Sequence, residues 1–115
     1  MDPSVADDPE IVKVAKALAD PTRFGILRAI AGASELSCGE IARRFPVSQA
    51  TVSHHVRILM ESGLVNVRRA GQFNYLRAVP DRLEWYCRTL RRLVGWSHRV
   101  SSWRRARTTR ARSKE

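Results

Sequence analysis

Apolar residues recur every three or four positions along five segments of the chain, at about residues 9–19, 21–32, 38–45, 49–62 and 80–95. This spacing predicts amphipathic helices, because it lines the apolar side chains along one face of each helix. Over residues 64–78 the spacing shortens to two, and Gly71 interrupts it, which predicts a β-hairpin. The pattern therefore predicts a mainly α domain in which four helices precede a small hairpin and one helix follows it.

The fourth predicted helix has two distinct faces. Ser48 is a favourable N-cap, and Gly63 suits the left-handed residue that ends a helix. One face is apolar and is assigned to the core: Val52, Val56, Leu59 and Met60. The opposite face carries small or polar groups: Gln49, Ala50, Ser53, His54, Arg57 and Glu61. His55 neighbours the apolar face, so we expect it to be partly buried.

A shorter helix just upstream completes a helix-turn-helix. Ser37 and Glu40 have the spacing of a capping box, and the apolar pattern that follows ends at Phe45, before Pro46. Two helices joined by such a tight turn are typical of proteins that place the second helix in the DNA major groove. The alternative is a helical hairpin whose polar face is only solvated.

We expect the hairpin after this helix to be the wing of a winged helix-turn-helix fold. Its tip is predicted to hold Arg68, Arg69 and Gln72, whose long side chains can reach phosphate groups or the minor groove. The alternative is an ordinary hairpin with solvated arginines. The predicted DNA-binding residues are Ser48, Gln49, Ala50, Thr51, Ser53, His54, Arg57, Arg68, Arg69 and Gln72.

The first two helices are predicted to be packing elements. The second one begins at Asp20-Pro21, where aspartate can cap the helix and proline fits the first helical position. The predicted buried positions are Ile11, Val14, Ala15 and Leu18 in the first helix and Phe24, Leu27 and Ile30 in the second.

The last helix has an apolar stripe that a small winged domain does not need for its own core. The helix is predicted to start at Pro80-Asp81, with Glu84 completing a second capping box. The stripe contains Leu83, Tyr86, Cys87, Leu90, Leu93 and Val94, whereas Arg82, Arg88, Arg91 and Arg92 are expected to face solvent. We therefore expect a twofold homodimer. Its predicted interface residues are Ile11, Val14, Leu18, Leu83, Tyr86, Leu90 and Leu93.

The charge of the chain indicates its kind of partner. The 115 residues contain 21 Lys+Arg against 11 Asp+Glu, a formal net charge of +10. Most of the basic residues are arginines, which bind phosphate bidentately, so double-stranded DNA is the expected partner. A membrane surface would also attract this charge, but no apolar run approaches the roughly 18 residues that span a bilayer.

Three regions follow from composition. Residues 1–8 are acidic and predicted to be disordered, residues 9–96 form the winged helix-turn-helix domain, and residues 97–115 form a basic tail. The tail either attracts phosphate regardless of sequence or only aids solubility. The N-terminus has neither the basic nor the apolar region of a secretion signal, and two distant cysteines make no disulfide framework. A cytoplasmic location is predicted.

Several segments, in this order, resemble the ArsR/SmtB family of bacterial winged-helix repressors. They are A-L-A-D-P-T-R-F-G-I-L at 17–27, E-L-S-C-G-E-I-A at 35–42, S-Q-A-T-V-S-H-H-V-R-I-L at 48–59, S-G-L-V at 62–65 and the arginine-bearing hairpin. The resemblance covers about residues 9–95. It implies a homodimer built on the first and last helices, which binds a palindromic operator, blocks transcription and is released when an inducer binds or modifies it.

The chain departs from the metal sites of that family. Ser37 and Gly39 occupy the places of the paired thiolates, so Cys38 lacks the partners that a tight thiolate site needs. Leu83 replaces the histidine of the Asp-x-His pair that begins at Asp81. We expect no metal and no cofactor, and the inducer is unknown.

Three further hypotheses remain. Cys38 is the first residue after the cap of its helix, where the partial positive charge can lower a thiol pKa, so it could act as a redox thiol, with or without Cys87. Both cysteines would otherwise be small apolar residues. No glycine-rich phosphate loop or hydrolase motif is present, so an enzyme is not expected. The remaining competitor is a regulator that acts mainly through protein contacts, which salt dependence of binding would distinguish.

Overall fold

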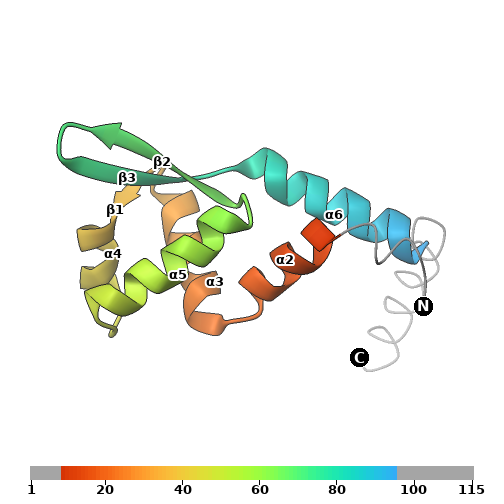
Figure 1. Ribbon diagram of the computed structural model, residues 1–115, viewed down its shortest axis with the longest axis horizontal. Helices are drawn as coiled ribbons and strands as arrows, with labels where there is room; N and C mark the ends of the chain where they lie inside the picture. Colours follow the sequence, from red (N-terminus) through yellow and green to blue (C-terminus); the bar gives the residue numbers. More distant parts are fainter. Residues whose placement is uncertain (1–8, 96–115) are drawn as a thin grey trace, which may run out of the picture.

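The computed structural model describes residues 9–95, so the acidic segment 1–8 and the basic tail 97–115 lie outside the described residues. In this region four helices, a hairpin and a final helix follow one another, as the sequence pattern predicts. Their arrangement is shown in Figure 1. The elements are α2 (Pro9–Leu18), α3 (Pro21–Gly32), β1 (Leu36–Ser37), α4 (Cys38–Arg44), α5 (Gln49–Glu61), β2 (Val65–Ala70), β3 (Phe73–Ala78) and α6 (Pro80–Val94).

Three of the helices begin at side-chain caps that the sequence predicts. The Asp20 carboxylate accepts a hydrogen bond from the backbone N–H of Arg23, 2.9 Å away. Ser37 and Glu40 form the complete capping box of α4, and the Ser48 hydroxyl caps α5. These caps satisfy backbone N–H groups that a first helical turn leaves without partners.

The second capping box, predicted at the start of α6, is wrong. The N-cap of α6 is Val79, which makes no side-chain cap hydrogen bond, and Pro80 lies in the first turn. Valine has no side-chain acceptor, so no side chain caps the first turn of this helix, and the backbone N–H of Arg82 donates to the Val79 carbonyl at 3.1 Å.

The wing belongs to a three-stranded antiparallel sheet, in the order β1-β3-β2. The sequence pattern predicts only β2 and β3, because β1 is two residues long. Its Leu36 lies opposite Leu76 of β3, and Leu76 also lies opposite Val67 of β2. The strand β1 leads directly into α4, so the helix-turn-helix is attached to the wing by backbone hydrogen bonds.

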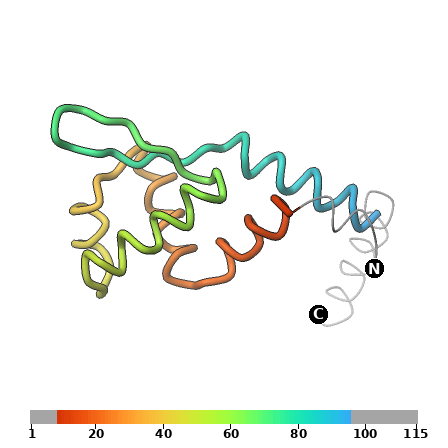
Figure 2. Tube along the Cα trace, viewed as in Figure 1, coloured from red at the N-terminus to blue at the C-terminus, as the bar shows by residue number. Residues whose placement is uncertain are grey.

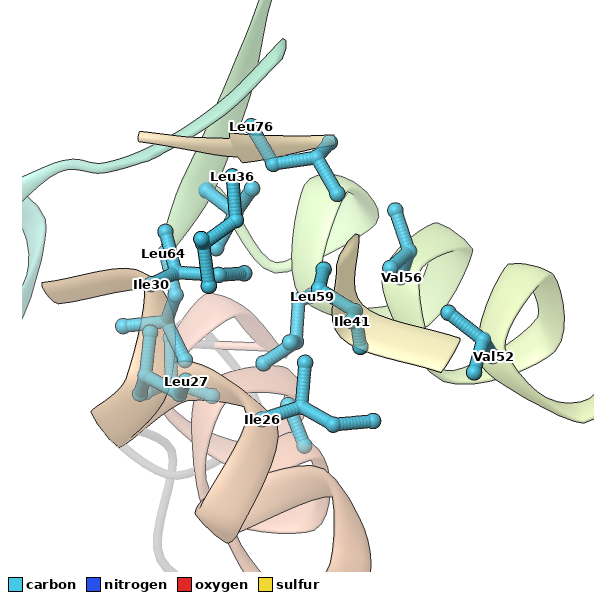
Figure 3. Packing of buried hydrophobic residues seen from close by; sticks show 13 residues of the cluster. Ile26, Leu27, Ile30, Leu36, Ile41, Val52, Val56, Leu59, Leu64 and Leu76 are labelled. Atoms are coloured by element: carbon cyan, nitrogen blue, oxygen red, sulfur yellow. The ribbon is translucent and has the colours of Figure 1, made fainter. Parts of the chain in front are cut away.

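The core lies between α2, α3, α4, α5 and the base of the sheet, and Figure 3 shows its packing. Leu59 of α5, Ile26 of α3 and Ile41 of α4 are fully buried there. Three predicted core residues, Ala15, Phe24 and Met60, are instead exposed. The buried faces of α2 and α3 are rotated about the helix axes relative to the predicted faces, because Ala17 and Ile26 are buried in addition to the residues that were predicted correctly.

Helices α2 and α6 contact one another, and Figure 2 shows α6 extending beyond the rest of the domain. An apolar stripe on α6 stays exposed in the single chain, where Leu83 is 42 %, Leu90 37 % and Val94 54 % exposed. Cys87, also exposed, lies between them at helical spacing, so the four side chains share one face. The stripe therefore remains available to a partner.

The predicted dimer-interface role of the first helix needs a correction. Ile11 and Val14 are buried in the core of their own chain, and Leu18 is half-buried against it. Val12 is the large apolar residue of α2 that stays exposed. On α6, Tyr86 also packs against the core, and Leu93 is half-buried. The single domain needs the main stripe of α2 for its own stability.

Candidate nucleic-acid interface

The polar face of α5 is exposed over its whole first half. Gln49, Ala50, Ser53, His54 and Arg57 are all exposed, as a surface that contacts another molecule must be. The helix is held from below by Val52, Val56 and Leu59, which are buried. The structure therefore gathers the residues predicted to face DNA on one side of one helix.

The first residues of α5 hold the helix start as well as facing outward. The Ser48 hydroxyl accepts from the Thr51 N–H at 3.1 Å and donates to the Thr51 hydroxyl at 3.0 Å. Thr51 is half-buried and its hydroxyl is already engaged. Ser48 and Thr51 thus form the cap, which leaves Gln49 as the first long side chain free to reach outward.

The two adjacent arginines of β2 have different surroundings. The guanidinium of Arg68 donates to both carboxylate oxygens of Glu35, at 2.7 and 3.0 Å, and lies 4.9 Å from the centre of the Tyr75 ring. Arg77 approaches the same carboxylate at 3.5 Å. These contacts occupy Arg68 within the chain. Arg68 also lies within β2 and not at the wing tip as predicted. The two-residue turn instead consists of Gly71 and Gln72.

Arg69 lies next to Arg68 but points to the other face of the hairpin, because successive strand residues alternate. It is exposed, and the structure gives it no ion-pair partner among residues 9–95. Arg57 of α5 has none in this region either. Both arginines are therefore free to meet an anion.

A groove of about 350 Å³ lies between α5 and the wing and brings these groups together. Its lining residues are Cys38, Ser53, Val56, Arg57, Met60, Val67, Arg69, Asn74 and Leu76. Two arginines from different elements thus flank one concave surface, which continues from the exposed face of α5. Phosphate groups prefer such paired guanidinium groups.

A buried arginine supports α5 from beneath, and the sequence analysis did not identify it. Arg23 donates to the carbonyls of Ala17, at 2.7 Å, and Lys16, at 2.9 Å, and its Nη1 lies 3.2 Å from Nδ1 of His55. Because arginine is only a donor, Nδ1 must accept, which places the histidine proton on Nε2, 3.9 Å from the Asp20 carboxylate. The expected burial of His55 is confirmed.

Hydrogen bonds lower the pKa of three carboxyl groups. The side-chain hydrogen bonds from Arg68 lower the pKa of Glu35, and the backbone N–H groups of Arg23 and Ser37 lower those of Asp20 and Glu40. The contact with Glu35 also raises the pKa of Arg68. All three interactions favour the charged forms, so they stabilise the caps and the wing at neutral pH.

Stability should accordingly decrease in acid. The folded chain binds a proton at Glu35 only below its ordinary pKa of 4.5, so the unfolded chain holds more protons around that pH. The contribution of Glu35 is therefore complete above about pH 4.5 and decreases as the pH falls through the lowered pKa. We expect the difference in Tm between the native chain and Glu35→Gln to be largest at neutral pH and to shrink towards pH 3.

Melting curves between pH 7 and pH 3 measure this difference. Glu84→Gln, which neutralises an exposed carboxylate on α6, is the matched control. A Glu35→Gln difference that stayed constant across this range would contradict the role of the Glu35 carboxylate in holding the wing.

The lowered pKa expected for the Cys38 thiol is not found. Burial raises the pKa of this thiol, because the desolvated thiolate is disfavoured. Cys38 and Cys87 are both free thiols, on α4 at the left of Figure 1 and on α6 at its right. A redox role for either cysteine stays a prediction.

The positions that the resemblance associates with metal sites carry other residues in this chain. Cys38 stands between Ser37 and Gly39, and α6 offers Leu83 where a histidine is needed. Among residues 9–95, the structure brings no three histidine, cysteine or acidic side chains into a metal-binding group. In the same region, no helix combines the length and the apolar character that crossing a bilayer requires.

The helix-turn-helix, the wing attached to it and the exposed polar face of α5 together define a winged helix-turn-helix DNA-binding module. Residues 18–68 match a family model described as a helix-turn-helix domain. The transcriptional repressor SdpR of Bacillus subtilis is 36% identical over 76 residues, which cover 63% of this chain and 83% of that protein.

Two solved structures have a similar fold. An ArsR-like transcriptional regulator from Rhodococcus sp. RHA1 is 29% identical with a TM-score of 0.72, over 88% of this chain and 95% of that one. A homodimeric winged helix-turn-helix DNA-binding domain from Mycobacterium bovis, a possible ArsR-family regulator, is 26% identical with a TM-score of 0.65, over 84% and 89%. The chain belongs to the ArsR/SmtB family of winged helix-turn-helix transcriptional regulators.

Proposed function

We propose that the protein is a homodimeric repressor that binds a palindromic operator. Two copies place their α5 helices in successive major grooves, roughly 34 Å apart, and their wings contact the flanking backbone. The observation that carries this proposal is the exposed polar face of α5, which continues into the groove flanked by Arg57 and Arg69. Bound in this way, the dimer would block transcription from the DNA it covers.

The exposed stripe of α6 supports the homodimer. Leu83, Leu90 and Val94 stay exposed in the single chain, and Val12 of α2 adds a further apolar side chain. Such residues gain the free energy of burial when a second copy covers them, at about 25 cal/mol per Å² before association costs. The homodimeric relative from Mycobacterium bovis has the same kind of fold.

In this proposal, different side chains contact the base edges and the phosphate groups of the DNA. Gln49, Ser53 and His54 lie on the exposed face of α5, where they would contact base edges or position the helix. Arg57 and Arg69 would hold phosphate groups, and Gln72 in the wing turn would reach the adjacent backbone. Arg68 acts indirectly, because its contacts with Glu35 hold the wing.

Selection of bound sequences from random duplex DNA tests the function directly. A repressor of this kind enriches a palindrome, and its affinity falls roughly 10³- to 10⁵-fold between 50 and 200 mM salt, because phosphate contacts release counterions. A regulator that acts mainly through apolar protein contacts would enrich no sequence. Mapping of occupied genomic sites would then identify the regulated genes.

Gln49→Ala and Arg69→Gln should affect DNA binding in different ways. Gln49→Ala is expected to relax the base preference at one or two positions, at a cost of about 1 to 3 kcal/mol on the selected operator. Arg69→Gln should weaken all sequences alike and reduce the salt slope by about one. Titrations of operator and scrambled DNA at several salt concentrations measure both effects.

Arg91→Gln, which removes the same charge from the exposed side of α6, is the control for Arg69→Gln. If Gln49→Ala left the base preference unchanged, Gln49 would not read a base. If Arg91→Gln reduced the salt slope as much as Arg69→Gln does, the effect would reflect net charge and not a contact made by the wing.

A further inference from the structure

One guanidinium group joins three elements of the fold. Arg82, in the first turn of α6, donates from Nε to the carbonyl of Ser62 at 2.9 Å and from Nη2 to the carboxylate of Glu10 at 2.7 Å. Its Cζ also lies 4.3 Å from the centre of the Trp85 ring. Arg82 therefore contacts α2, α6 and the end of α5, although the sequence pattern predicts that it faces solvent.

The contact with α5 falls at the point where that helix ends. Ser62 is the C-cap of α5 and is fully buried, and Gly63 follows with φ +82°. A Cβ at Gly63 would lie only 2.9 Å from Nε of Arg82, so the two residues fit closely. The backbone N–H of Val79 donates to the carbonyl of Leu64 at 2.9 Å, which holds the start of α6 against the same turn.

We propose that Arg82 is a positioning residue, which fixes the angle between α5 and the helices that form the dimer. This inference rests on the proposed function, because α2 and α6 carry the apolar side chains assigned to the dimer interface. Arg82, on α6, donates one hydrogen bond to the Glu10 carboxylate of α2 and one to the Ser62 carbonyl at the end of α5, so it links both of these helices to α5.

The length of α5 makes this angle important. The helix has 13 residues, and at 1.5 Å per residue it is about 20 Å long. A rotation of roughly 10° about its C-terminal end would therefore move its N-terminal residues by about 3.4 Å, which is the length of one base-pair step. Loss of the Arg82 contacts at the end of α5 should therefore change the half-site spacing that a dimer accepts.

The test compares Arg82→Met with Arg88→Met in the full-length protein. Both variants remove one positive charge from α6, but Arg88 is exposed and only 3.9 Å from Glu84 on its own helix. The DNA probes are the operator selected with the native protein and two versions with the half-site spacing changed by one base pair. Sedimentation and circular dichroism establish that each variant is a folded dimer.

We expect the native protein and Arg88→Met to prefer the selected spacing by about tenfold. Arg82→Met should remain dimeric and bind the three spacings nearly equally, so it should lose the roughly tenfold advantage of the selected operator. If Arg82→Met does not fold, Glu10→Gln and Arg82→Lys, which keep part of the contact, should show a partly flattened preference.

A folded dimeric variant that kept the native spacing preference would overturn the role of Arg82. Failure of the native protein to select any palindrome would instead overturn the proposed function. The two results are distinguishable because the first is measured only on variants, against a native protein that binds.

Discussion

Replacing Arg23 with alanine is expected to lower the free energy of unfolding by about 3 kcal/mol. Arg23 is buried, and its side chain donates to two backbone carbonyls and lies against the ring of His55. Each hydrogen bond from a charged donor contributes about 1.5 kcal/mol or more, and the truncation also removes packing. Because domains of this size are stable by about 5 to 15 kcal/mol, this is a large fraction of the total.

The position of Arg23 explains why no other residue can replace it. The carbonyls of Lys16 and Ala17 belong to the last turn of α2, which carries partial negative charge, and the Lys16 carbonyl also accepts from the backbone N–H of Ala19 at 3.2 Å. The guanidinium group satisfies both carbonyls and also meets α5 through His55. Lysine keeps the charge but cannot form this fork, so Arg23→Lys should be intermediate.

Urea unfolding followed by circular dichroism measures these free energies. The matched control is Arg28→Ala, which truncates an exposed arginine of the same helix and should change the stability by less than about 0.5 kcal/mol. Equal effects of Arg23→Ala and Arg28→Ala would show that the buried contacts of Arg23 contribute nothing to stability.

Leu90→Glu is expected to abolish the homodimer and, with it, high affinity for a palindromic operator. Leu90 lies in the middle of the exposed stripe of α6, and an ionised carboxylate there would have to be buried without a partner when a second copy packs against it. A monomer binds only one half-site. It loses the advantage of linked binding, so operator affinity should fall on the order of 10²- to 10⁴-fold.

Sedimentation velocity reports the dimer, and operator titration reports the affinity. Arg91→Gln is the control, because it changes the net charge by the same amount on a neighbouring exposed residue of α6. Circular dichroism should show the native helix content in both variants, since Leu90 is not part of the single-chain core. A Leu90→Glu protein that still sedimented as a dimer would contradict the proposed interface.

Local signals were sufficient for the elements that position the interface. Asp20, Ser37 and Ser48 cap helices as predicted, and Gly63 has the positive φ expected where α5 ends. These features depend on hydrogen bonds and steric limits within a few residues, so the sequence reveals them directly. The exposed face of α5 follows from the same local periodicity.

Contacts between distant residues were not predictable from the pattern. Arg68 looks like a solvated wing arginine until Glu35, far away in the chain, is placed beside it. Arg23 and Arg82 break the rule that arginine stays outside, because each finds backbone carbonyls at a helix end. The burial of Ala17 and the exposure of Met60 likewise depend on which elements pack against α2 and α5.

By itself, the sequence determined the order of the helices and of the two hairpin strands, the caps of α3, α4 and α5, the polar face of α5 and the family, because each is encoded in neighbouring residues or short motifs. Only the tertiary structure decided which arginines are free to bind phosphate and which hold the fold together. It also decided which apolar side chains remain for a second copy. Both depend on long-range packing, where one carboxylate or carbonyl brought close changes the role of a side chain.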